Sequence, residues 1–159
     1  MTQLTIDIAD MKVSREPGDV LVTYALGSCI ALMVHDPVLK AGGMIHYMLP
    51  QGSTAPDKAK VRPYMFADTG IPLLFHAMYD LGCNKQNLVV KVAGGAALMT
   101  TTDLFEIGKR NHLILRKMLW KAGVAIKAED VGGTTFRTAK LFNATGRVTI
   151  KNETSEHEL

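Results

Sequence analysis

The sequence is poor in features that would place it outside the cell or in a membrane. It has only two cysteines, Cys29 and Cys83, and no secretory pattern, because Asp7 and Asp10 interrupt the short apolar stretch at the start. We therefore expect reduced thiols in a cytoplasmic protein rather than a disulfide scaffold. The longest apolar run, residues 92–99, is too short to cross a bilayer, so we expect no membrane insertion.

The chain also has too little charge and too few aromatic residues for a nucleic-acid-binding protein. The net charge is +3 and aromatic residues make up 6%, and the Lys and Arg residues are not interleaved with aromatics. The cysteines and the five histidines do not show the spacing of a zinc site, and no glycine pair continues into a phosphate loop. We expect no metal, no cofactor and no nucleic-acid partner.

The remaining composition is that of a soluble globular protein, with 47% apolar and 21% charged residues in a length that suits one domain. Apolar and β-branched patterns predict strands over residues 4–8, 20–26, 29–35, 43–49, 88–93, 124–129, 135–142 and 147–151. Helical spacing predicts two helices, over residues 68–81 and 108–121. This order predicts an α+β fold, a mixed β-sheet sandwich covered by two main helices. We expect the first strands to pair antiparallel, because their connections are short.

Three finer expectations concern segments between and beyond these elements. Residues 50–63 have no periodic pattern and predict a long loop, either disordered or in contact with a substrate. Asp68 is expected to cap the first long helix. We expect residues 1–151 to form a single domain, followed by a polar, frayed tail over residues 152–159.

The candidate chemistry lies in a thiol and an imidazole seventeen residues apart. Cys29 follows a tight Gly27-Ser28 turn, where backbone N–H groups can form an anion-binding hole for a substrate. His46, on the neighbouring predicted strand, would generate the thiolate if the two side chains meet. Thr23, on the strand entering the turn, can supply the hydroxyl that fixes the tautomer of His46.

Each of these residues also has an ordinary structural explanation. A free cysteine is commonly a small buried hydrophobe, and a lone histidine in an apolar run is commonly a hydrogen-bonded core residue. Thr23 fits any β-branched strand position. The other cysteine, Cys83, and the other histidines are interpreted as structural or solvated; these histidines are His35, His76, His112 and His157.

The motifs around these residues resemble the CheD family of chemoreceptor glutamine deamidases. The resemblance begins with Leu26-Gly27-Ser28-Cys29 and Gly43-Met44-Ile45-His46-Tyr47-Met48-Leu49-Pro50. It continues, in the family's order, through the blocks starting at Tyr64, Ala93, Ile107 and Ala128, and so covers nearly the whole chain.

The resemblance implies hydrolysis of glutamine side-chain amides in methyl-accepting chemotaxis receptors, giving glutamate and ammonia through a thioester. It assigns Cys29 as nucleophile, His46 as base and Thr23 as orienting residue. It also implies a fold similar to the catalytic domain of glutamine-deamidating bacterial toxins, and a CheC-type phosphatase as partner. In this family a glycine is common where this chain has Ala25.

Two other functions stay open at the level of sequence. The basic residues Lys58, Lys60 and Arg62 suit an adaptor that acts by docking on receptors or on a CheC-type phosphatase. An accessible Cys29 of low pKa would suit a redox sensor, although the sequence offers no well-placed resolving cysteine.

Overall fold

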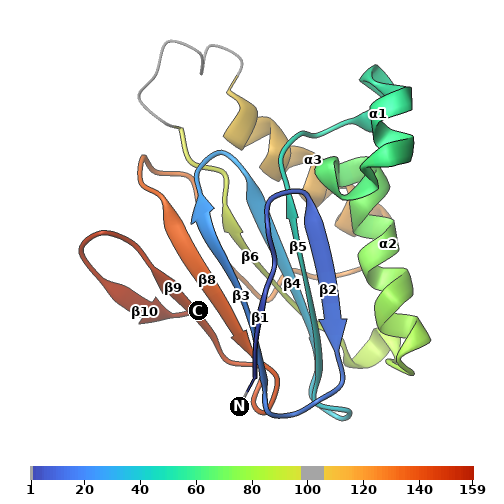
Figure 1. The fold of residues 1–159 in the computed structure, drawn as a ribbon, viewed down its shortest axis with the longest axis vertical. Helices are drawn as coiled ribbons and strands as arrows, with labels where there is room; N and C mark the ends of the chain where they lie inside the picture. The colour runs from blue at the N-terminus through green and yellow to red at the C-terminus, as the bar shows by residue number, and fades with distance from the viewer. Residues whose placement is uncertain (1, 98–105) are drawn as a thin grey trace.

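A computed structural model describes residues 2–97 and 106–159, which form two five-stranded sheets flanked by helices (Figure 1). Sheet A has the strand order β1 (Thr2–Thr5), β3 (Asp19–Leu26), β8 (Arg137–Phe142), β9 (Val148–Lys151) and β10 (Glu156–Glu158). Sheet B has the strand order β2 (Asp10–Ser14), β5 (Ala41–Tyr47), β4 (Ile30–Asp36), β6 (Val89–Gly94) and β7 (Ala128–Val131). Each sheet is mixed, because β1 runs parallel to β3 and β6 parallel to β7 while the other neighbours are antiparallel.

Three α-helices lie in the described residues, and two of them are long. These are α1 (Pro56–Val61), α2 (Ala67–Asp80) and α3 (Ile107–Lys121), with short 3-10 turns at Gly52–Thr54, Pro63–Met65 and Lys85–Asn87. The expected α+β class with two main helices is confirmed. Within the described ranges, no helix combines the length and apolarity needed to span a membrane.

The molecule has three layers, with α2 and α3 on one face of sheet B and sheet A on the other (Figure 1). Side chains alternate along a strand, so β5 contributes to two different cores. Ile45 and Tyr47 pack toward the helices, whereas Met44 packs between the sheets. His46 shares the face of Met44 and therefore lies between the two sheets.

The expected antiparallel pairing of the strands on either side of Gly27-Ser28 is wrong. Strand β3 belongs to sheet A and β4 to sheet B, so the turn carries the chain from one sheet to the other. The register of β3 against β8 shifts between Thr23 and Leu26, and Ala25 there has a left-handed φ of 56°. Such a bulge bends and twists a strand, which a short connection alone does not reveal.

The expected loop over residues 50–63 is largely helical, since it holds α1, the whole 3-10 turn Gly52–Thr54 and the first residue of the turn Pro63–Met65. Ala59 is the one buried residue of α1. Because a helix that buries a single residue needs no repeated apolar positions, the sequence shows no helical periodicity here. Asp68 does not cap α2, whose N-cap is Phe66. Instead its carboxylate accepts a hydrogen bond from the Gly52 N–H at 2.7 Å, which ties this segment to the first turn of α2.

The chain ends differ from expectation as well. The predicted frayed tail contains β10, which pairs antiparallel with β9, and the Lys91 ammonium donates to the Leu159 carbonyl at 2.9 Å. The strand expected over residues 124–129 begins only at Ala128, and that expected over residues 4–8 is β1, which ends at Thr5.

The left-handed backbone at Ala25 predicts a stabilising substitution. An L-residue pays about 1 kcal/mol or more for this conformation, and glycine does not. We expect Ala25→Gly to raise the free energy of unfolding by about 1 kcal/mol in urea denaturation. Ala125, also exposed but without a positive φ, is the control, because Ala125→Gly should destabilise slightly. Equal losses in both variants would contradict the prediction.

Candidate active site

A buried hydrogen bond joins the two sheets at the centre of the candidate site. The Oγ1 atom of Thr23, on β3, lies 2.7 Å from Nδ1 of His46, on β5, and both residues are 0% exposed. The same hydroxyl lies 2.6 Å from the carbonyl oxygen of Ile6. Thr23 and His46, predicted from distant parts of the sequence, are thus in direct contact.

These two contacts determine which ring nitrogen of His46 carries the proton. A threonine hydroxyl has one proton, and the Ile6 carbonyl can only accept, so the hydroxyl donates to Ile6. Thr23 Oγ1 must then accept from His46, which places the imidazole proton on Nδ1. The lone pair is left on Nε2, the atom that can act as a base.

Cys29 immediately precedes β4 and borders the core between the two sheets, the side of sheet B on which this imidazole lies. Ala31 pairs directly with His46 across β4 and β5, and Cys29 precedes Ala31 by two residues. Continued one residue beyond the start of β4, this register makes the two residues diagonal neighbours, a relation in which backbone positions are typically about 7–8 Å apart and side chains can reach one another. The buried Nε2 atom has no hydrogen-bond partner in the part of the chain that the structure describes, so the thiol does not hydrogen-bond to it. In enzyme active sites generally, contacts between a nucleophile and its base commonly tighten only when substrate binds.

Burial keeps both groups uncharged at neutral pH. Desolvation raises the pKa of the Cys29 thiol to about 11, against a smaller opposite effect of its own backbone N–H. Desolvation lowers the pKa of His46 to about 4, although the charge of Asp7 acts in the opposite direction. The pair is therefore a neutral thiol and a neutral imidazole, so attack by this sulfur on any electrophile would require transfer of its proton.

The turn before β4 is held by its carbonyl groups. The carbonyl oxygens of Gly27, Ser28 and Cys29 accept, respectively, from Ala96 N at 2.9 Å, Asn111 Nδ2 at 3.0 Å and Gly95 N at 2.9 Å. Apart from the interaction of the Cys29 N–H with its own sulfur, the backbone N–H groups of these three turn residues donate to no other residue within residues 2–97 and 106–159. They are thus available to a substrate oxygen.

Close approach of β6 to this turn requires glycine. A Cβ atom on Gly94 would lie 2.2 Å from the Cys29 carbonyl oxygen, and Gly94 has a φ of 115°. The Gly94-Gly95 pair thus lets the backbone of this turn approach closely.

The other candidate side chains lie elsewhere. Cys83 is buried in the core between sheet B and the helices, whereas Cys29 borders the core between the sheets, and both are free thiols. His35 Nε2 donates to the Asn143 carbonyl, and His112 pairs with Glu129 at 2.7 Å. In the described residues, no cluster of three or more His, Cys, Asp or Glu side chains is placed to hold a metal ion.

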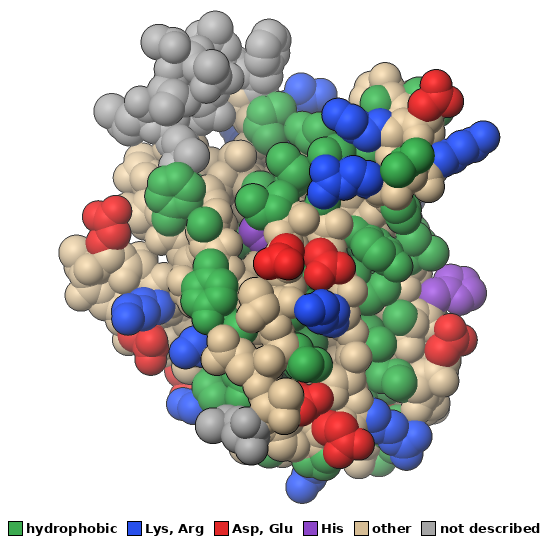
Figure 2. Space-filling model, in the orientation of Figure 1, with side chains coloured by type: hydrophobic (Ala, Val, Ile, Leu, Met, Phe, Trp, Pro, Cys, Tyr) green, Lys and Arg blue, Asp and Glu red, His purple; other side chains and the backbone are tan. Residues whose placement is uncertain are grey.

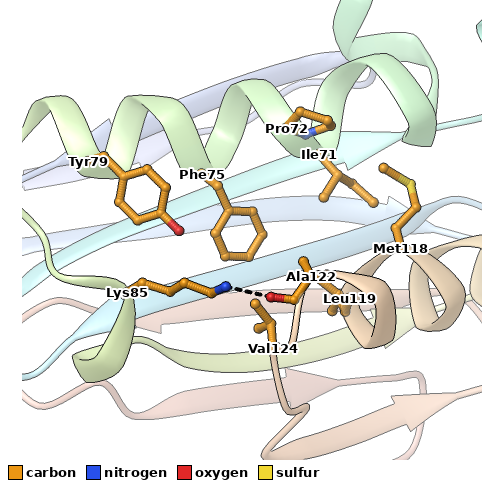
Figure 3. Close-up of a pocket in the computed structure, with 9 residues that line it drawn as sticks. All are labelled: Ile71, Pro72, Phe75, Tyr79, Lys85, Met118, Leu119, Ala122 and Val124. Atoms are coloured by element: carbon orange, nitrogen blue, oxygen red, sulfur yellow. Dashed lines mark hydrogen bonds between the residues drawn. The ribbon is translucent and has the colours of Figure 1, made fainter.

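A cavity of about 240 Å³ lies between α2 and α3, away from this site (Figure 3). Phe75 from α2 and Met118 from α3 line it, and Lys85 donates to the Ala122 carbonyl at its edge. Its walls are apolar and include neither Cys29 nor His46. The cavity belongs to the helical side of sheet B.

Two groups of this site were missed by sequence reasoning, the Ile6 carbonyl and the Asn111 amide. A backbone carbonyl leaves no trace in the identity of its residue. Asn111 occurs within one of the blocks that carry the family resemblance, but it has no partner at a fixed spacing that would reveal its contacts.

Burial of neutral His46 predicts a loss of stability in acid. The folded state resists protonation down to about pH 4, whereas an unfolded histidine takes up a proton near pH 6.5. Its contribution is complete above pH 6.5 and falls as pH drops toward 4, by about 2 kcal/mol between pH 7.5 and pH 5. Urea unfolding of wild type and His46→Gln checks this, and an equal pH dependence in both proteins would contradict it.

Comparison with known proteins identifies the family. The family described as CheD chemotactic sensory transduction matches residues 48–152, more than half of the chain. A "Probable chemoreceptor glutamine deamidase CheD 1" from Syntrophus aciditrophicus is 52% identical over 152 residues, which are 96% of this chain and 95% of that protein. Proteins with similar names from Solibacter usitatus (46% identical, 100% of this chain and 94% of that protein) and Anaeromyxobacter dehalogenans (49%, 96% of each) also match. The chain belongs to the CheD family.

Proposed function

We propose that this protein is a chemoreceptor glutamine deamidase, a cysteine amidohydrolase that converts receptor glutamines to glutamates. The names of close relatives over nearly the full length support the substrate class. The observation that carries the proposal is the imidazole of His46, held by Thr23 with its basic nitrogen unpaired, on the sheet face that Cys29 shares.

The proposed reaction proceeds in two acyl-transfer steps. His46 Nε2 takes the Cys29 proton as the sulfur attacks the glutamine carboxamide carbon, and N–H groups of Ser28 and Cys29, with Gly27 shaping the turn, bind the oxyanion. The imidazolium then protonates the leaving nitrogen, so that ammonia departs and a thioester forms. Nε2 next takes a proton from water, which attacks the thioester, and the released thiol recovers that proton. The residues of the site suffice for each step, so the proposal requires no cofactor.

The proposed setting is the cytoplasmic chemotaxis machinery. The substrate is the helical cytoplasmic region of methyl-accepting receptors, and a CheC-type phosphatase is the proposed regulatory partner. Each reaction adds one negative charge to a receptor helix, and a charge there can bias a signalling equilibrium. We also propose that the sandwich shares its topology with the catalytic domain of glutamine-deamidating toxins.

A docking role is the second candidate, and the surface of α1 favours it. Lys58, Lys60 and Arg62 are exposed there, next to Val61, which is 81% exposed. Figure 2 shows Lys and Arg side chains gathered around this helix, at the upper right. An exposed apolar residue within a basic patch suits an acidic protein partner. This surface can serve receptor binding whether or not catalysis occurs.

Replacing Cys29 separates the two candidates. We expect Cys29→Ala to reduce deamidation of a receptor cytoplasmic fragment by about 10⁴-fold or more, because the nucleophile is lost. Ammonia release and a mass gain of about one dalton per glutamine, the difference between NH₂ and OH, are the measurements. Cys83→Ala is the matched control and should retain activity. Undiminished deamidation by Cys29→Ala, or full rescue of chemotaxis by it in a deletion strain, would contradict the enzymatic proposal.

The orienting role of Thr23 predicts different results for two substitutions. Thr23→Val keeps the shape but removes the acceptor for the His46 Nδ1 proton, and we expect kcat to fall by about 10²- to 10⁴-fold. Thr23→Ser keeps the hydroxyl and should retain kcat within about tenfold. Steady-state kinetics on the receptor fragment measure both. Similar kcat values for the valine and serine variants would show that the hydroxyl does not orient the base.

A further inference from the structure

Asn111 links the turn that carries Cys29 to the segment that follows His46. It lies on α3 and is 0% exposed. Its Nδ2 donates to the Ser28 carbonyl at 3.0 Å and to the Met48 carbonyl at 2.8 Å. Carbonyls only accept, so the orientation of this amide is determined and both of its protons are used.

The backbone of Asn111 is held in turn by its neighbours. Its carbonyl oxygen accepts from the Tyr47 hydroxyl at 2.7 Å, and Tyr47 is fully buried in the helix-side core. Gly108, one turn earlier, lies so close to the segment that follows β6 that a Cβ atom there would be 2.5 Å from the Ala96 carbonyl oxygen. The first turns of α3 are therefore seated firmly on sheet B, and the Asn111 amide has little freedom.

Peptide geometry transmits this constraint to the nucleophile. The Ser28 carbonyl and the Cys29 N–H belong to one planar trans peptide, in which they point in opposite directions. Fixing the Ser28 oxygen on Asn111 therefore fixes the direction of the Cys29 N–H, away from α3. Apart from its interaction with the Cys29 sulfur itself, this N–H donates to no other residue in the described part of the chain. It is a preorganised donor of the kind that stabilises an oxyanion.

We propose that Asn111 is a positioning residue, which orients the Cys29 N–H toward the oxyanion of the transition state. The inference rests on the proposed deamidase function and adds a residue to it. Asn111 does not touch the reacting atoms, and it acts through the Ser28–Cys29 peptide. Its second contact, with Met48, keeps the chain after His46 in register with that peptide.

Asn143 provides a matched control within the same chain. It is also 0% exposed, and its Nδ2 also donates to two carbonyls, those of Ser14 and Glu16. In both asparagines the buried Oδ1 atom has no partner in the described residues. Asn143 pairs its backbone N–H with Asp19, at the start of β3, whereas the candidate site lies toward the end of that strand. The two residues thus share burial and bonding but differ in proximity to Cys29.

The experiment compares Asn111→Ala and Asn111→Ser with Asn143→Ala, each under conditions in which urea unfolding shows a folded protein. Two rates are measured, deamidation of a receptor fragment and alkylation of Cys29 by iodoacetamide. All variants also carry Cys83→Ala, so that Cys29 is the one cysteine that can be alkylated. Alkylation requires a nucleophilic sulfur but forms no oxyanion, so it reports on the thiol alone. Asn111→Ser retains one short donor and serves if Asn111→Ala does not fold.

We expect kcat to fall by about 10- to 100-fold in the Asn111 variants, with KM and the alkylation rate changed by less than about threefold. Asn143→Ala should retain kcat. An unchanged kcat in folded Asn111 variants would overturn the inference, as would an equal loss in Asn143→Ala or a parallel loss of alkylation. Absence of deamidation by wild type would overturn the proposed function, and the inference with it.

Discussion

The hydrogen bond between Thr23 and His46 crosses from one sheet to the other through an otherwise largely apolar layer. Its geometry depends on the whole sandwich, because β3 and β5 belong to different sheets and meet only through their inward faces. A shift of β5 by one residue would turn His46 toward the helices. The distances of the contact therefore reflect the register of sheet B and the packing of the two sheets.

The burial of this contact also determines the protonation states of the Cys29 thiol and the His46 imidazole. Removal from water favours the neutral forms of both groups, so the pKa values of the thiol and the imidazole move apart. The buried Nε2 atom without a hydrogen-bond partner destabilises the folded protein, and such unsatisfied polar atoms commonly occur at functional sites. A neutral pair resists indiscriminate oxidation and alkylation, because the thiolate is the reactive form. In the proposed reaction, substrate binding brings the two groups together before the sulfur attacks.

Much of this organisation was predictable from the sequence, and the failures have physical causes. Periodicity predicted the long helices and most strands, since each has a buried face several residues long. It could not predict that β3 and β4 separate into two sheets, because a left-handed Ala25 has no signature in the pattern. The polar α1 was also invisible, as it buries little besides Ala59. At the site, Cys29, His46 and Thr23 were named in advance, and their catalytic roles stay predictions. Asn111 and the Ile6 carbonyl act through long-range contacts that spacing along the chain does not encode.

The central claim is that Thr23 holds His46 in the tautomer whose Nε2 is free to accept the Cys29 proton. Nitrogen-15 NMR of the His46 ring at neutral pH measures this directly, because protonated and unprotonated ring nitrogens have well-separated shifts. The account predicts a neutral ring with its proton on Nδ1 and a bare Nε2, and a loss of this preference in Thr23→Val. A proton on Nε2 in the wild-type protein would contradict it.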